Sequence, residues 1–169
     1  MIAELLVIVA LPVLLAAAAG WDVASFTIPN FLQLAILAAF AVFVMAAGLG
    51  PAAIGLHLLS GFVGLAVGFT LFALGYIGGG DAKLFAGVLL WLGFRDVMNY
   101  TLLASVLGGG LTLAILGLRN LPLPARLTSQ GWILRLHDEK SGIPYGVALA
   151  AAAFVMLPHT EIFHVASGL

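Results

Sequence analysis

Two aspartates occupy unusual places in this apolar chain. Asp22 ends an unbroken apolar run beside Trp21, and residues 21–30 contain no basic side chain to pair with it. Asp81 closes the run Gly78-Gly79-Gly80-Asp81, directly before another apolar segment. An ionisable group at membrane depth is costly and by default marks a functional site. The two acids are therefore candidate chemical groups.

Each acid also has a purely structural interpretation. Three glycines allow close backbone approach, and the free N–H groups and dipole of a helix N-terminus favour an acid there. Residues 78–81 are therefore also typical of an ordinary helix start. An acid beside Trp21 is also compatible with a simple membrane-interface position.

As a pair, the two acids suggest a reaction. Two carboxylates within hydrogen-bond reach in a partly desolvated site do not both ionise easily, so they share a proton. The ionised partner can take a proton from water while the protonated one donates to a peptide carbonyl oxygen. This is aspartic-protease chemistry.

The same chemistry needs no metal and no cofactor, and we expect neither. The chain has no cysteine, which excludes thiolate nucleophiles and cysteine-based metal sites. His159, Glu161 and His164 lie near one another in the sequence, but their spacing fits no common two-histidine metal motif.

The composition describes an integral membrane protein. Of 169 residues, 63% are hydrophobic and 8% charged, whereas soluble domains carry about 25% charged residues. The formal net charge of −1 offers no basic surface for nucleic acid. We therefore expect the lipid bilayer as a partner and no nucleic acid.

Apolar runs predict an all-α polytopic fold with about six transmembrane helices in a single domain over residues 1–169. A span needs about 20 mostly apolar residues, and charges, prolines and glycines divide the chain into residues 2–20, 31–49, 53–76, 82–94, 97–118 and 143–158. The fourth run is too short to cross a bilayer unless the bilayer thins or flanking residues help.

Basic residues predict the orientation. With the N-terminus outside, five of the six lie on the cytoplasmic side, four of them in the loop of residues 119–142. Two complete spans separate Asp22 from Asp81, so both acids should lie at the same, cytoplasmic, membrane face. The stretch 132–136 of the loop could form an interfacial helix.

Three interior features have structural interpretations. We expect His57 to be a hydrogen-bonded interior histidine. Gly64 and Gly68, like the run Gly108-Gly109-Gly110, should permit close helix packing. Lys83, two residues after Asp81, either tunes the acid pair electrostatically or extends to water from the interface.

Three ordered motifs resemble the type IV prepilin peptidases, which are intramembrane aspartyl proteases of the Gly-x-Gly-Asp class. They are Gly78-Gly79-Gly80-Asp81, Ile28-Pro29-Asn30 after the first acid, and Ile143-Pro144-Tyr145-Gly146 before the last span. Length and span number resemble the short Flp/Tad pilus (CpaA/TadV-like) branch.

The resemblance implies roles for individual residues. Asp22 and Asp81 match the catalytic pair, Gly78 and Gly80 the motif glycines, and Pro29-Asn30 the segment after the first acid. It also implies a reaction, removal of the leader peptide from a prepilin partner at the cytoplasmic face of the inner membrane, and hence a role in pilus biogenesis.

Two alternatives stay open. An archaeal-type preflagellin peptidase has a similar size and mechanism. In a different class, a small proton-coupled transporter or channel subunit could use the same acids as relay groups. Transport sites usually lie near the midplane, whereas both acids here map to one membrane edge.

Overall fold

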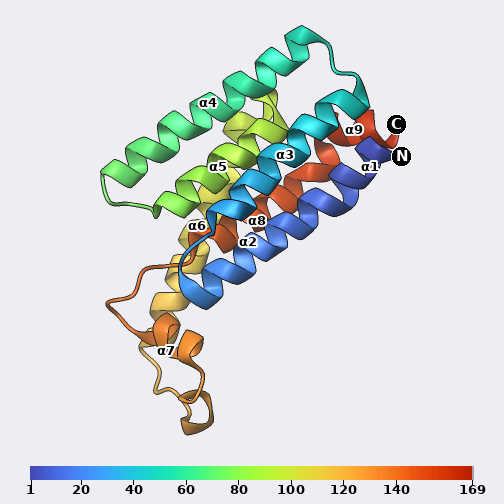
Figure 1. Cartoon of the computed structure of the whole chain (residues 1–169). Helices are drawn as coiled ribbons and strands as arrows, with labels where there is room; N and C mark the ends of the chain where they lie inside the picture. Colours follow the sequence, from blue (N-terminus) through green and yellow to red (C-terminus); the bar gives the residue numbers. More distant parts are fainter. Residues whose placement is uncertain (169) are drawn as a thin grey trace.

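Apolar helices build this structure, a computed structural model that describes residues 1–168 (Figure 1). No strand occurs in that part of the chain, and the prediction of an all-α fold is confirmed. The α-helices are α1 (Ile2–Leu5), α2 (Leu11–Ser25), α3 (Asn30–Ala47), α4 (Pro51–Ala73), α5 (Gly79–Leu92), α6 (Val97–Arg119), α7 (Gly131–His137), α8 (Tyr145–Met156) and α9 (Glu161–Ser167).

The first span is one continuous helix with a π turn inside it. The π turn, η1 (Leu6–Ala10), joins α1 to α2. Pro12 follows the π turn and has no N–H to donate to the Ile8 carbonyl oxygen, as a regular α-helix would require. The wider turn therefore lies where the regular backbone hydrogen bonds are interrupted. The helix then continues past Gly20, its predicted end, to Ser25. Asp22 therefore lies within the last turns of α2.

In the described part of the chain, four helical segments are long and apolar enough to cross a membrane, namely Ile2–Ser25, Asn30–Ala47, Pro51–Ala73 and Phe94–Arg119. A fifth segment, α8 with α9, bends by 55° at its break. The remaining predicted span corresponds to α5, which has only 14 residues. The structure thus supports a polytopic membrane protein, while six crossings and their orientation stay predictions.

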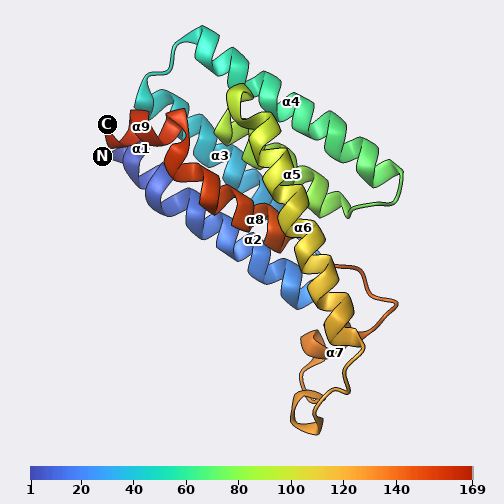
Figure 2. The ribbon, with the colours of Figure 1, turned by 180° about the vertical axis from the view of Figure 1, so that it is seen from behind.

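Protein rather than lipid surrounds most of α5. Leu84, Val88 and Trp91 are almost completely buried, and α5 packs against α3, α4 and α8. Figures 1 and 2 show it in the interior of the bundle. A helix enclosed by other helices does not have to match the bilayer thickness itself, which explains how so short an apolar helix is accommodated.

Glycines bring α4 and α5 into close contact. A Cβ added at Gly64 would lie 3.0 Å from the Ala86 Cα, and one at Gly68 would lie 2.9 Å from the Ala82 carbonyl oxygen. The predicted close packing at Gly64 and Gly68 is therefore confirmed. The predicted interior hydrogen bond of His57 is also confirmed, because its Nδ1 lies 2.8 Å from the Leu90 carbonyl oxygen.

The glycine run in α6 behaves differently. A Cβ at Gly108 would contact the Tyr145 ring at 3.4 Å, but a Cβ at Gly109 or Gly110 would have no neighbouring atom within 4 Å. The expectation of close packing was wrong for these last two residues. They follow Gly108 around the helix and face away from α8, so no neighbouring helix approaches them.

The ends of the bundle have different characters. Both chain termini lie at one end, whereas α2 ends and α5 begins at the other (Figures 1 and 2). The segment between α6 and α8, which contains α7, extends from this second end. The predicted short helix in the loop of residues 119–142 is thus present as α7.

Candidate active site

A pocket of about 250 Å³ lies where α2 ends and α5 begins. It is lined by the two aspartates and by the segments next to them, namely Asp22, Phe26, Thr27, Ile28, Gly78, Gly79, Gly80 and Asp81. The exposed fractions of Asp22 and Asp81 are only 4% and 7%. The prediction that both acids lie at the same end of the molecule is therefore confirmed.

A backbone amide from α8 holds Asp22. The Gly146 N–H donates to Asp22 Oδ2 over 2.7 Å. A Cβ at Gly146 would lie 2.8 Å from that same oxygen and 2.9 Å from the Ile28 Cδ1. Both distances are shorter than normal carbon contacts, so a side chain at this position would force the Asp22 carboxylate or Ile28 to shift.

The helix start holds Asp81 by only one of its oxygens. The Gly78 N–H donates to Asp81 Oδ2 over 3.2 Å, and Asp81 stands in the first turn of α5. Asp81 Oδ1 is buried and has no hydrogen-bond partner among the described residues. A buried polar atom without a partner costs about 1–3 kcal/mol, so this oxygen is suited to a proton, a water or a substrate group.

The two carboxylates share one buried pocket. Asp22 and Asp81 both line it, and both side chains are buried. Two negative charges in one buried pocket repel each other, so the arrangement favours a state in which only one of the two carboxylates is ionised. That is the state that acid–base catalysis by two carboxylates requires.

The connection between α2 and α3 closes the pocket from one side. Phe26 has a φ of 55° and ends α2. A Cβ at Gly80 would lie 3.2 Å from the Ile28 backbone nitrogen, so Gly80 allows this connection to pack directly on the start of α5. The Gln33 Nε2 then donates to the Gly80 carbonyl oxygen over 3.1 Å.

Arg119 organises the segment that leads to Gly146. It is the last residue of α6, and its Nε donates to the Leu136 carbonyl oxygen over 2.8 Å. Its Nη2 donates to the carbonyl oxygens of Ser141 and Gly142, each over 3.0 Å. One planar guanidinium thus fixes both the end of α7 and the chain that runs to the start of α8.

The predicted supporting residues divide into two groups. Gly78 and Gly80 line the pocket with the two aspartates. Asn30 and Lys83 instead contact each other, the Lys83 Nζ donating to the Asn30 Oδ1 over 2.8 Å, and both line a different cavity. Pro29 is the residue directly before α3 and has no side-chain capping hydrogen bond.

Three contributors to the site were not predicted: the Gly146 amide, Arg119 and Gln33. The Pro144-Tyr145-Gly146 motif did mark the region of the first, but no sequence feature indicated a contact with Asp22. Gln33 is a lone amide in a long apolar run, a signal that could have indicated a specific hydrogen bond. Arg119 is the only charged residue at the end of α6. A basic residue at that position is also typical of the charges that set the orientation of a membrane span, so it did not indicate a role in the site.

The histidines near the C-terminus lie elsewhere. His159, Glu161 and His164 line a pocket with Arg95 and Asp96, at the end of the bundle where the termini lie. No group of three or more side chains that could hold a metal ion occurs within residues 1–168.

The comparison with known families agrees with the geometry. The sequence model of the type IV leader peptidase family matches residues 9–113, which is more than half of the chain and includes both aspartates. The chain belongs to the type IV leader peptidase family. No curated protein and no solved structure matches it.

The candidate site includes a segment that lies beyond the residues matched by the family model. In this type IV leader peptidase the match ends within α6, before Arg119 and its three hydrogen-bond partners and before the Gly146 amide that holds Asp22. The protein is thus a membrane-embedded peptidase whose candidate acid pair is completed by α8.

Proposed function

We propose that this chain is an intramembrane aspartic endopeptidase that removes the N-terminal leader from type IV prepilins of the Flp/Tad-like class. The observation that carries the proposal is the shared pocket of Asp22 and Asp81, in which Asp81 Oδ1 is buried and has no hydrogen-bond partner within residues 1–168. A water molecule and a peptide carbonyl both need a polar group at such a position.

Hydrogen bonding supports one division of roles between the two acids. The Gly146 N–H donates to Asp22 over 2.7 Å, whereas the hydrogen bond that the Gly78 N–H donates to Asp81 is longer, at 3.2 Å. A short bond from an N–H stabilises the ionised form of a carboxylate. Asp22 is therefore the general base, and Asp81, with Oδ1 free to carry the shared proton, is the general acid.

The reaction balances with these two groups alone. Asp22 takes a proton from water as the water oxygen forms a bond to the scissile carbonyl carbon. Asp81 donates its proton to the carbonyl oxygen, which gives a neutral tetrahedral diol. The diol then collapses with cleavage of the C–N bond, a diol proton returns to Asp81, and Asp22 passes its proton to the leaving amine.

The position of the pocket at one end of the bundle suits the substrate. The helix ends that carry the acids meet at one end of the bundle (Figure 1), which the distribution of basic residues predicts to be cytoplasmic. A prepilin leader is hydrophilic and precedes an apolar helix. Cleavage at the inner-membrane face lets the leader stay in water while the helix stays in lipid.

Cleavage of a co-expressed Flp/Tad-like prepilin tests this function. We expect Asp22→Asn and Asp81→Asn each to lower the cleavage rate by at least about 10²-fold, because each removes a positioned acid or base. Asp96→Asn is the matched control, since Asp96 lies in the pocket at the opposite end. All variants are compared at equal amounts in the membrane fraction.

Three outcomes would contradict parts of the proposal. Full cleavage by either variant in the acid pair would exclude the two-aspartate mechanism. Cleavage of an archaeal preflagellin but not of a bacterial prepilin would correct the substrate. Proton flux through reconstituted wild-type protein, abolished by either substitution and unaccompanied by cleavage, would move the chain to the transporter class.

A further inference from the structure

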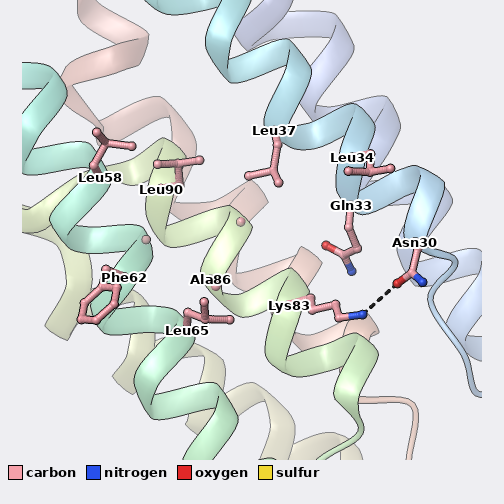
Figure 3. A pocket seen from close by; sticks show the side chains of 12 residues that line it. Asn30, Gln33, Leu34, Leu37, Leu58, Phe62, Leu65, Lys83, Ala86 and Leu90 are labelled. Atoms are coloured by element: carbon pink, nitrogen blue, oxygen red, sulfur yellow. Dashed lines mark hydrogen bonds between the residues drawn. The ribbon is translucent and has the colours of Figure 1, made fainter.

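A second cavity, a groove of about 660 Å³, lies between α3, α4 and α5 (Figure 3). Each helix contributes four lining residues, from Asn30 to Leu37, from Leu58 to Leu65, and from Lys83 to Leu90. In all three helices these residues occupy positions i, i+3, i+4 and i+7. The groove therefore has one regular face of a helix on each of its three sides.

This spacing indicates the shape of what fits there. Positions i, i+3, i+4 and i+7 form the stripe that a helix turns toward a neighbouring helix. Three such stripes surround a vacant position in the way that three members of a four-helix bundle surround the fourth. The stripes extend over two helical turns, about 10 Å. The groove thus fits an α-helix in contact over about two turns.

The chemistry of the groove matches an apolar helix. The walls carry exposed apolar side chains, among them Leu34 and Phe62, whose exposed fractions are 64% and 69%. Gly61, Ala86 and Gly87 also line the groove, and small residues let another helix backbone approach closely within a membrane. The polar end of the groove carries the hydrogen-bonded pair of Lys83 and Asn30 (Figure 3).

The groove lies next to the candidate active site, on the other side of the first turn of α5. Gln33 lines the groove, and its side-chain amide donates to the Gly80 carbonyl oxygen. Gly80 lines the pocket of the acid pair and directly precedes Asp81. Only the first turn of α5 and this hydrogen bond therefore separate the polar end of the groove from the carboxylates.

We propose that this groove docks the apolar helix that follows the cleavage site of the substrate. This inference rests on the proposed function. With the leader in water and the scissile bond at the acid pair, the first turns of the substrate helix pack from the end of the groove at Lys83 toward the end at Leu90. The groove then selects substrates by their apolar helix, independently of the leader.

A variant in which a larger side chain fills the groove tests the proposal, because its cleavage of two substrates can be compared. One is a full-length prepilin, and the other is a peptide with the leader and the cleavage site but without the apolar helix. We expect Leu37→Trp, which adds bulk to a half-exposed wall residue, to lower the ratio of full-length to peptide cleavage about tenfold. The matched control is Val106→Trp on α6, which is 70% exposed and outside the groove, and which should keep the wild-type ratio.

Photocrosslinking gives a readout that does not depend on turnover. With p-benzoylphenylalanine at position 62 of the inactive Asp81→Asn protein, we expect a crosslink to the apolar segment of the full-length substrate. The same probe at position 106 should give none. A crosslink from position 62 to lipid alone, with an unchanged cleavage ratio for Leu37→Trp, would overturn the proposal and identify the groove as a lipid site.

Failure of the proposed function has a different signature. If the wild type cleaves neither the prepilin nor the peptide, the peptidase assignment for this substrate class is wrong, and the docking proposal falls with it. If the wild type cleaves both and the Leu37→Trp ratio is unchanged, only the docking proposal is wrong.

Discussion

Gly146 and Asp22 stand far apart in the sequence and form the shortest backbone hydrogen bond to either candidate catalytic carboxylate, 2.7 Å from the Gly146 nitrogen to Asp22 Oδ2. The contact joins the start of α8 to the end of α2. It makes α8, which lies outside the segment that matches the peptidase family, a part of the candidate site.

Gly146→Ala should therefore impair activity through a steric contact. The new Cβ would lie 2.8 Å from Asp22 Oδ2, so the carboxylate or the start of α8 has to move. We expect cleavage to fall by about 10²-fold, because small displacements of catalytic groups have effects of this size. Gly109→Ala in α6 is the matched control, since nothing lies within 4 Å of its Cβ position. Equal activity of both variants would show that the Gly146 contact does not position Asp22.

Arg119→Lys should lower activity although the charge is kept. A lysine ammonium cannot reproduce the fork with which Arg119 binds the carbonyl oxygens of Leu136, Ser141 and Gly142. We expect about a tenfold loss of cleavage and faster proteolysis in residues 120–142, measured on the purified protein. The control is Arg126→Lys, a conservative change at an exposed position of the same loop. If Arg119→Lys behaves like this control, the fork has no role in holding the segment.

Asp81→Asn should abolish cleavage yet stabilise the fold. Asp81 is buried, and within residues 1–168 its Oδ1 has no hydrogen-bond partner, so a neutral amide that cannot ionise lowers the cost of burying a side chain there. We expect a gain of about 1 kcal/mol in the free energy of unfolding at neutral pH, as is common when a strained active-site residue is replaced. Thermal unfolding in detergent measures it, and a lower Tm than that of the wild type would contradict it.

Gly64→Ala should destabilise the protein through the contact of α4 with α5. Its Cβ would lie 3.0 Å from the Ala86 Cα and 2.8 Å from the Leu89 Cδ1. Overpacking of this kind costs about 1–3 kcal/mol, which should appear as a lower Tm. Gly55→Ala in the same helix meets nothing within 4 Å and should leave the Tm unchanged or raise it.

Sequence patterns were sufficient for the helices and for bringing the acids together. The apolar runs predicted each of the long helices, because a membrane requires continuous apolar segments. Counting the spans between Asp22 and Asp81 placed both at one end of the bundle, and the structure agrees. The Gly64 and Gly68 spacing also predicted a close helix contact.

Contacts between distant segments could not be predicted in this way. A sequence pattern predicts which face of a helix is buried but not which segment packs against that face. The hydrogen bond from Gly146 to Asp22 therefore could not be predicted from the sequence. Lys83 lies two residues after Asp81, which places the two side chains on nearly opposite faces of α5. It therefore contacts Asn30 in the groove and not the acid pair, although the two residues are close in sequence.

The π turn at Leu6–Ala10 sets the helical phase of the first acid. Each residue advances an α-helix by about 100°, and a π turn accommodates one residue more than the regular helix would. The chain before the turn and the chain after it are therefore out of register by one residue. If the same residues formed a regular α-helix without the π turn, Asp22 would face about 100° away from its present direction relative to the N-terminal turn. The geometry of the pocket at one end of the bundle thus depends on a local irregularity near the other end.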